Sequence, residues 1–354
     1  MSVADPGAAA PGRPKQGQPP RGAASTRSDE HGGSKAAAPG SAAHNLASMG
    51  PIKWPAEAIW EAVVPDLPGF TIEIVPQIDS TNTELMRRAR AGRLEPVLLV
   101  AEQQSAGRGR LGRHWFSGQP ANVGAGAAHA QASVGASAAA GPPQGETAPL
   151  GGSAAHAVAS VGATSSLTFS LGLPLSPGDW SGLSLAVGVS LVQSLHPDLH
   201  LKWPNDVWLH DRKLAGILIE TVSLGDSAVG RYAVIGVGIN ILPREATGLA
   251  TPPAWLGEVM PGVDAPQALL RIAAPLVQAL KVFESHGFAP FRTRFNARDA
   301  LGGLTVSLSD GTTGVAQGVD GVGALLVHTA RGLEKITSAE VSVRPLSSPP
   351  YEHL

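Results

Sequence analysis

Residues 107–115 read GRGRLGRHW, and this run of glycines and arginines, ended by a tryptophan, is the most informative stretch of the chain. Glycine lets the backbone approach a ligand closely and leaves a loop mobile when no ligand is bound. Arg108, Arg110 and Arg113 add planar, permanently charged groups that suit carboxylates and phosphates. The stretch predicts a loop that closes over an anionic ligand, although Arg-Gly repeats also occur in segments that bind nucleic acids.

The composition of the chain limits its function. The formal net charge is −2 over 354 residues, whereas dedicated nucleic-acid binders usually carry a strong basic excess. The absence of cysteine excludes disulfides, zinc–thiolate sites and cysteine nucleophiles. We find no apolar run that could span a membrane and no secretory signal, so we expect a cytoplasmic protein without a membrane partner.

Two long segments do not have the composition of a folded domain. Residues 1–50 are rich in Ala, Gly, Pro and Ser, and we expect them to be a disordered tail. Because Met49 directly precedes the first sequence of globular character, we hypothesise that translation starts there. Residues 123–165 have a similar composition and predict a disordered insertion, in which His129 and His156 are solvated rather than ligands.

The stretch before the Gly-Arg loop predicts alternating helices and strands. We expect a helix over 55–63, a strand over 70–78, a second helix ending at Gly92, and a strand over 96–104. The spacing of Thr81 and Glu84 fits a capping box at the start of the second helix. The sequence 79–82, DSTN, is therefore either a plain helix cap or a group of free N–H donors and hydroxyls that holds a polar ligand.

The remaining chain predicts further strands and helices. Residues 166–175 alternate as in a half-buried strand, and the spacing of Trp180, Leu183, Val187 and Leu191 predicts a helix packed on a core. We expect a buried strand over 232–239 and a long helix over 266–286 that Pro275 kinks. Short strands from Leu301 onward predict a small antiparallel barrel or sandwich.

The sequence 200–209, HLKWPNDVWL, forms one half of a predicted hairpin and is the second informative stretch. Lys202 stands at a strand end before Trp-Pro, and lysine is a poor interior residue unless it meets an anion. Asn205 and Asp206 supply the oxygen ligands that Mg²⁺ accepts. The alternative is an ordinary Pro-Asn-Asp turn beside an exposed lysine.

Taken together, these motifs resemble those of the biotin protein ligases, over about residues 74–344. The resemblance implies an α+β fold: a mixed sheet backed by helices, like the core of class II aminoacyl-tRNA synthetases, followed by a small SH3-like β-barrel. It implies a catalytic domain over 51–298, a C-terminal domain over 299–345 and a loose tail over 346–354. The motifs that carry it are Asp79–Asn82, Gln104–Arg113, Trp115, Lys202–Asp206, Lys213–Leu218 and Gly238–Asn240.

The resemblance also implies an activity. The family uses ATP and Mg²⁺ to convert biotin to biotinyl-5'-AMP, then transfers the biotinyl group to a lysine of the biotin carboxyl carrier domain of acetyl-CoA carboxylase or a related carboxylase. It implies Lys202 and Arg110 as catalytic residues and Trp115 as an apolar lid. The implied biotin contacts are Ser80, Thr81, Asn82, Gln104, Arg108, Gly109, Arg110 and Lys202; the implied ATP contacts are Arg113, Trp115, Lys213 and Asn240; and the metal candidates are Asn205 and Asp206.

The N-terminal segment departs from that of many relatives. A winged helix that binds an operator often precedes the catalytic domain, whereas here only residues 51–70 separate the tail from the first strand. We therefore expect a monofunctional ligase without DNA binding, and a homodimer is one possible assembly. A lipoate protein ligase and a nucleic-acid-binding protein remain the alternatives.

Overall fold

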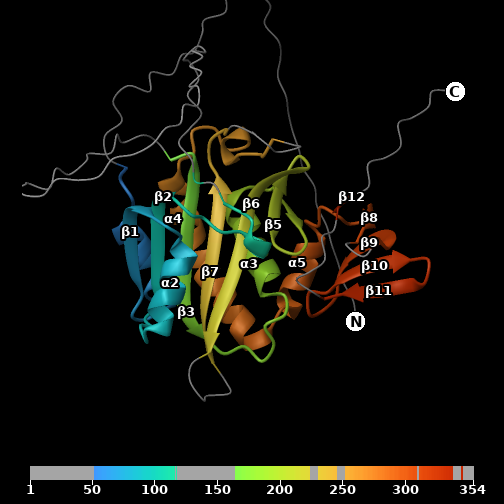
Figure 1. Cartoon of the computed structure of the whole chain (residues 1–354), viewed down its shortest axis with the longest axis horizontal. Helices are drawn as coiled ribbons and strands as arrows, with labels where there is room; N and C mark the ends of the chain where they lie inside the picture. The colour runs from blue at the N-terminus through green and yellow to red at the C-terminus, as the bar shows by residue number, and fades with distance from the viewer. Residues whose placement is uncertain are drawn as a thin grey trace, which may run out of the picture. The chain divides into compact units, whose positions relative to one another are not determined.

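The computed structural model describes residues 52–115, 117, 164–223, 230–244, 252–308, 311–337 and 344–345. These residues belong to one compact unit, residues 46–354. The predicted tails, and the predicted insertion up to residue 163, lie outside the described residues. The described part is an α+β fold built on two sheets (Figure 1).

The larger sheet has seven strands in the order β1-β2-β3-β7-β6-β5-β4. Strands β1 and β2 run parallel, and every other neighbouring pair is antiparallel, so the sheet is mixed as predicted. The strands are β1 (Thr71–Ile78), β2 (Val97–Gln104), β3 (Ser166–Leu175), β4 (His200–Lys202), β5 (Asp206–Leu209), β6 (Arg212–Ser223) and β7 (Arg231–Asn240).

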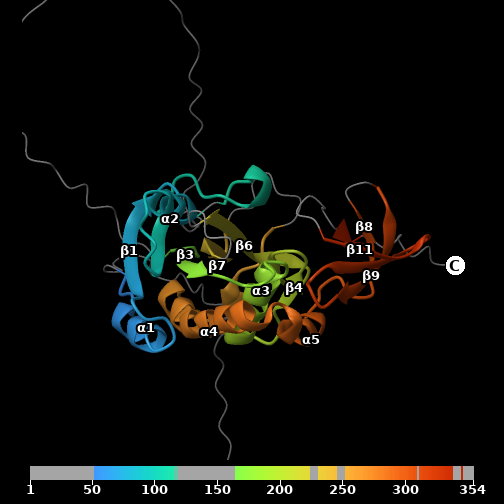
Figure 2. The same cartoon turned by 90° about the horizontal axis from the view of Figure 1, so that it is seen from below.

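Helices cover the two faces of this sheet unequally (Figure 2). The helices α1 (Ala56–Val63), α3 (Leu183–Leu195), α4 (Ala265–His286) and α5 (Arg292–Asn296) lie along one face, over the main apolar core. Among the described helices of four residues or more, α2 (Thr81–Arg90) alone packs on the opposite face, over a second, smaller apolar cluster. Short 3-10 turns complete the described part at Arg110–Gly112, Leu256–Glu258 and Ala289–Phe291.

The smaller sheet is antiparallel, in the order β11-β10-β9-β8-β12. Two backbone hydrogen bonds join β4 to the segment that precedes the smaller sheet: Leu201 N donates to Arg298 O (2.7 Å), and Ala300 N donates to Leu201 O (2.9 Å). Among the described residues no pairing joins β11 to β12, so closure into a barrel stays a prediction. The strands are β8 (Thr305–Ser307), β9 (Thr313–Val319), β10 (Leu325–Thr329), β11 (Gly332–Ile336) and β12 (Arg344–Pro345).

Two local expectations differ from the structure. Strand β3 is buried on both faces rather than on one, because it lies between β2 and β7 with helices on either side. Ser80, not Thr81, is the N-cap of α2, and its hydroxyl accepts the Thr83 N–H at 3.4 Å. Glu84 does not complete a capping box, since its carboxylate pairs with Arg87 and Arg88 one turn later.

Candidate active site

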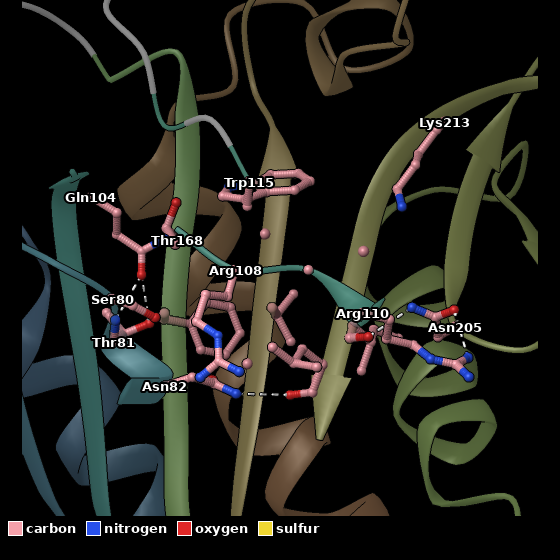
Figure 3. A pocket seen from close by; sticks show the side chains of 18 residues that line it. Ser80, Thr81, Asn82, Gln104, Arg108, Arg110, Trp115, Thr168, Asn205 and Lys213 are labelled. Carbon is pink, nitrogen blue, oxygen red and sulfur yellow. Dashed lines mark hydrogen bonds between the residues drawn. The ribbon is translucent and has the colours of Figure 1, made fainter. Parts of the chain in front are cut away.

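A small cavity of about 50 Å³ lies on the sheet face that carries α2 (Figure 3). The N-terminus of α2 and the end of β2 form one wall, and the Gly-Arg loop (residues 105–115) crosses above. Strands β3, β7 and β6 form the floor. The sequence-predicted site residues that line it are Ser80, Thr81, Asn82, Gln104, Arg108, Gly109, Arg110, Trp115, Asn205 and Lys213.

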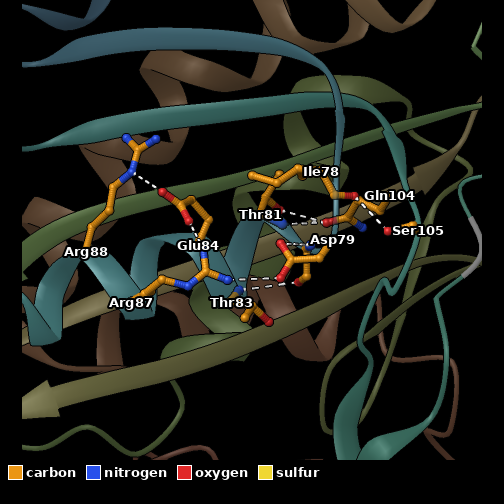
Figure 4. Close-up of polar contacts among 10 residues, drawn as sticks. Ile78, Asp79, Thr81, Thr83, Glu84, Arg87, Arg88, Gln104 and Ser105 are labelled. Carbon is orange, nitrogen blue, oxygen red and sulfur yellow. Dashed lines mark hydrogen bonds and ion pairs between the residues drawn. The ribbon is translucent and has the colours of Figure 1, made fainter. Parts of the chain in front are cut away.

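The wall at α2 is neutral, polar and held by hydrogen bonds (Figure 4). Gln104 Oε1 accepts both the backbone N–H of Thr81 (2.7 Å) and its hydroxyl (3.1 Å). Asp79 accepts the Ser80 N–H at 2.7 Å and pairs with Arg87 at 3.0 Å, which fixes the turn before the helix. Because the motif DSTN both caps the helix and lines the cavity, the two interpretations of it are compatible.

Asn82 lies at the bottom of this wall and is almost fully buried. Its amide N–H₂ donates to Leu218 O (3.3 Å) and to Glu220 Oε2 (3.0 Å), while Oδ1 accepts the Ser170 hydroxyl (2.6 Å). A Cβ at Gly236 would overlap Oδ1 of Asn82, so this position of β7 requires glycine. Both sides of the Asn82 amide are therefore fixed by the sheet.

The opposite wall is basic. Arg110 donates to Asn205 Oδ1 at 3.1 Å, and burial lowers the pKa of its guanidinium although Asp206 lies nearby. Lys213 also lines the cavity and pairs with Asp206 at 2.7 Å. Arg108 lies across the cavity with half of its side chain exposed, and faces Glu220 at 3.5 Å. The cavity thus carries Arg110 and Lys213 at one end and neutral hydrogen-bonding groups at the other, with the Arg108–Glu220 ion pair beside Asn82.

Trp115 lies flat on strand β7. A Cβ at Gly238 would overlap its indole ring, and the Arg244 guanidinium lies 5.4 Å from the ring centre. The indole N–H is buried, with no hydrogen-bond partner among the described residues. The ring therefore forms an apolar surface beside the cavity.

Four predicted residues do not line this cavity. Lys202 lies beside it: its ammonium is 4.3 Å from the Trp208 ring centre, in a neighbouring hollow that shares Asn205 and Ile217 with the main cavity. Asn240 is buried, and its side-chain amide donates to Ala254 O at 2.9 Å. Arg113 closes the loop through its backbone, since its carbonyl accepts the Gly109 N–H at 2.7 Å. The fourth residue, Asp206, is held by Lys213.

The metal candidates do not fit a metal ion as they are arranged. Asn205 Oδ1 accepts the Arg110 guanidinium, and Asp206 Oδ1 holds the Lys213 ammonium, so cationic side chains occupy both oxygens. In the described part of the chain, no three His, Asp or Glu side chains are grouped as metal ligands. We derive no step through Mg²⁺, and its assignment to this pair stays a prediction.

Sequence reasoning missed Ser170 and Glu220, which support the cavity from the sheet. Ser170 Oγ lies 2.7 Å from Thr81 Oγ1 and donates to Asn82, and Thr168 of the same strand lines the cavity. The signal was present: Ser166, Thr168 and Ser170 alternate with apolar residues, which places small polar groups on one face of β3. Nothing in the sequence near Glu220 distinguishes it from an exposed strand residue.

Comparison with known proteins agrees with this fold. Residues 160–240 match the Biotin/lipoate A/B protein ligase family, and residues 305–344 match the Biotin protein ligase C terminal domain. A solved biotin protein ligase from Aquifex aeolicus, in complex with biotin and ATP, covers 78% of this chain and 99% of its own, with a TM-score of 0.55 and 24% identity. That likeness concerns the fold.

Two curated relatives define the family more narrowly. The Biotin--[acetyl-CoA-carboxylase] ligase of Paracoccus denitrificans is 31% identical over 277 residues, which are 76% of this chain and 98% of the relative. The Bifunctional ligase/repressor BirA of Escherichia coli is 30% identical over 295 residues, 80% of this chain and 77% of that protein. The chain belongs to the biotin protein ligase family, and its activity is the ATP-dependent activation of biotin and its transfer to protein.

Proposed function

We propose that the cavity between α2, the Gly-Arg loop and strands β3, β7 and β6 is where this ligase forms and holds biotinyl-5'-AMP. The observation that carries this proposal is the unequal chemistry of the two ends of the cavity. Biotin is neutral at its ureido head and anionic at its carboxylate tail, so a site with one neutral and one cationic end orients it. The rival ligand lipoate shares the carboxylate and lacks the ureido group.

The ureido head belongs at the α2 end in this proposal. Ser80, Thr81 and Gln104 present hydroxyl and amide groups that match the donors and acceptors of a cyclic urea. Their mutual hydrogen bonds support the assignment, because groups fixed in advance lose little conformational entropy when the ligand arrives. We further assign Asn82 to this end, with Arg108 and Gly109 closing over the ligand.

The carboxylate and the α-phosphate belong at the basic end. The attack of one anion on another is favoured by fixed cations that position both groups and stabilise the charge developing between them. Arg110 and Lys213 line this end, and we assign Lys202 the bridging role beside them. That role requires the Lys202 ammonium to leave the Trp208 ring and enter the cavity through the wall formed by Asn205 and Ile217.

We assign ATP to the Trp115 end of the loop, with Arg113, Lys213 and Asn240 as further contacts. The apolar indole ring of Trp115, which lines the cavity, supports this for the adenine ring. Burial of Asn240 against Ala254 O argues for an indirect role of that residue. The loop would exclude water from the adenylate once it has formed.

The protein acceptor in this proposal is the biotin carboxyl carrier domain of acetyl-CoA carboxylase or a related carboxylase. The name of the Paracoccus denitrificans relative, Biotin--[acetyl-CoA-carboxylase] ligase, supports this choice. Mg²⁺ dependence, a homodimer, a cytoplasmic location and the absence of DNA binding stay part of the proposal. In the described part of the chain, no helix is both long and apolar enough to cross a membrane.

Transfer of labelled biotin to a purified carrier domain, with lipoate as the competing substrate, tests the proposal. We expect ATP-dependent labelling with biotin and none with lipoate. Thr81→Val should raise the KM for biotin about tenfold, because a ureido group would lose a hydrogen-bond partner in a buried site. An unchanged KM for biotin in this variant would exclude the α2 end as the site of the ureido head.

A further inference from the structure

We propose that Glu220 is a positioning residue that orders the biotin pocket from the sheet side, by holding Asn82 and Arg108 at the same time. This inference rests on the proposed function, since it takes the cavity to be the biotin pocket. Glu220 does not line the cavity, and we assign it no contact with substrate. It acts through the two residues that its carboxylate oxygens face.

The contact with Asn82 is the more buried of the two. Glu220 Oε2 accepts one Asn82 N–H at 3.0 Å, and the amide is only 3% exposed. Leu218 O and Ser170 hold the rest of the amide, so Glu220 completes a set of partners that leaves one orientation of Asn82. Removing the carboxylate would leave a buried donor without its partner and would allow the amide to turn.

The second contact joins the Gly-Arg loop to strand β6. Glu220 Oε1 faces the Arg108 guanidinium at 3.5 Å, and their side chains are 22% and 50% exposed. The loop also closes on its own backbone, through Gly109 N to Arg113 O (2.7 Å) and Trp115 N to Gly107 O (2.8 Å), and Arg110 donates to Asn205 outside it (3.1 Å). Glu220 therefore gives Arg108 an anchor on β6. Because the pair is half exposed, its effect on affinity should be small.

Steady-state kinetics of Glu220→Gln and Glu220→Ala test the inference. Gln keeps a hydrogen-bond acceptor for Asn82 and loses only the charge toward Arg108, so the KM for biotin should rise about threefold. Ala loses both contacts, so the KM for biotin should rise about tenfold or more. In both variants, kcat and the KM for ATP should stay within about twofold of the parent.

A structural readout accompanies the kinetics. Without ligand, trypsin cleavage after Arg108 should be about threefold faster in Glu220→Gln, since the loop has lost the ion pair between Arg108 and Glu220. In an Arg108→Ala background, Glu220→Gln should add nothing to the KM for biotin. The matched control is Glu84→Gln, because Glu84 is 15% exposed and pairs with arginines, yet does not line the cavity.

The outcomes separate the inference from the proposed function. If Thr81→Val raises the KM for biotin and Glu220→Ala leaves it within twofold, or lowers it, the inference fails while the pocket assignment stands. If neither variant changes the KM, the pocket assignment fails first. If Glu220→Gln lowers kcat and thermal stability and raises the KM values for biotin and ATP together, Glu220 is merely structural. That outcome would also overturn the inference.

Discussion

The two ends of the cavity are built differently. At the α2 end, groups come from a helix N-terminus and from the central strands, and they are fixed by hydrogen bonds of 2.6 to 3.1 Å among Thr81, Asn82, Gln104 and Ser170. At the basic end, Arg110 comes from a glycine-rich loop and Lys213 from β6, and both are partly exposed. We infer from this comparison that the neutral head meets a preformed surface, and we expect the glycine-rich loop to adjust when the anionic tail binds.

The largest effect that sharpens this comparison should come from Lys202. Losing one charge-stabilising donor typically costs about 10² to 10³ in rate, so Lys202→Gln should slow adenylate formation by at least that factor. Lys202→Arg should also fail, because a planar group does not replace a compact ammonium between two anions. Transfer from pre-made biotinyl-AMP should suffer less, because carboxylate and phosphate are already joined.

Pyrophosphate exchange and single-turnover transfer measure these two steps separately. Lys281→Gln is the control, since Lys281 lies on α4 and pairs with Asp66, away from the cavity. Exchange at the parental rate in Lys202→Gln would leave the lysine packed on Trp208, as it lies in the structure, with no part in the chemistry.

A second test addresses how rigid the α2 end is. In Gly236→Ala the new methyl group would overlap Oδ1 of Asn82, and overpacking of this kind typically costs about 1 to 3 kcal/mol. We expect the KM for biotin to rise tenfold or more, with a smaller change in the KM for ATP. Gly178→Ala is the control, because nothing lies within 4 Å of a Cβ there. A parental KM for biotin in Gly236→Ala would show that the α2 end adjusts to the methyl group without loss of binding.

A third test addresses how mobile the basic end is. Trypsin cleavage after Arg108 and Arg110 should slow severalfold when biotin and ATP are both present, because the ligand orders the loop. The rates are read by mass spectrometry, with cleavage after Arg331 in the β10–β11 turn as an internal control. Equal protection in the free enzyme would mean that the loop is as preformed as the opposite wall.

The smallest effect should come from deleting residues 123–163 of the predicted insertion; residues 164 and 165 are kept, because Ser165 O accepts the Ile241 and Leu242 N–H groups. The entropy of closing a loop changes only logarithmically with its length, so stability should change by about 1 to 2 kcal/mol or less. We expect kcat for biotin transfer to stay within a few-fold of the parent. A hundredfold loss with the fold intact by circular dichroism would make this segment part of the site.

The same contrast explains how much the sequence reveals. The pattern of strands and helices follows from apolar periodicity, and Ser80, Thr81, Gln104 and Arg110 stand in motifs whose residue types already indicate polar recognition. Glu220 was not predicted, because its role depends on a contact with Asn82, 138 positions earlier in the chain. Such a contact follows from strand register and not from local sequence.

Other differences arise where two residues satisfy one local rule. Ser80 and Thr81 are both of residue types that cap helix N-termini well. A capping box with Glu84 would select Thr81, but the Glu84 carboxylate pairs with Arg87 and Arg88 instead. Lys202 stands in a motif shared with the site, yet its side chain packs on Trp208. Sequence spacing predicts that a residue is near a site more readily than it predicts its rotamer.

The most direct test of the two-ended pocket is calorimetric titration with biotin and with biotin amide, which keeps the ureido head and lacks the charge. The parent, Thr81→Val and Arg110→Ala are each titrated with both ligands. We predict that Thr81→Val weakens both ligands by the same factor, about tenfold, and that Arg110→Ala weakens biotin but leaves the affinity for biotin amide unchanged. Equal losses for both ligands in Arg110→Ala, or a selective loss for biotin in Thr81→Val, would contradict the assignment of head and tail.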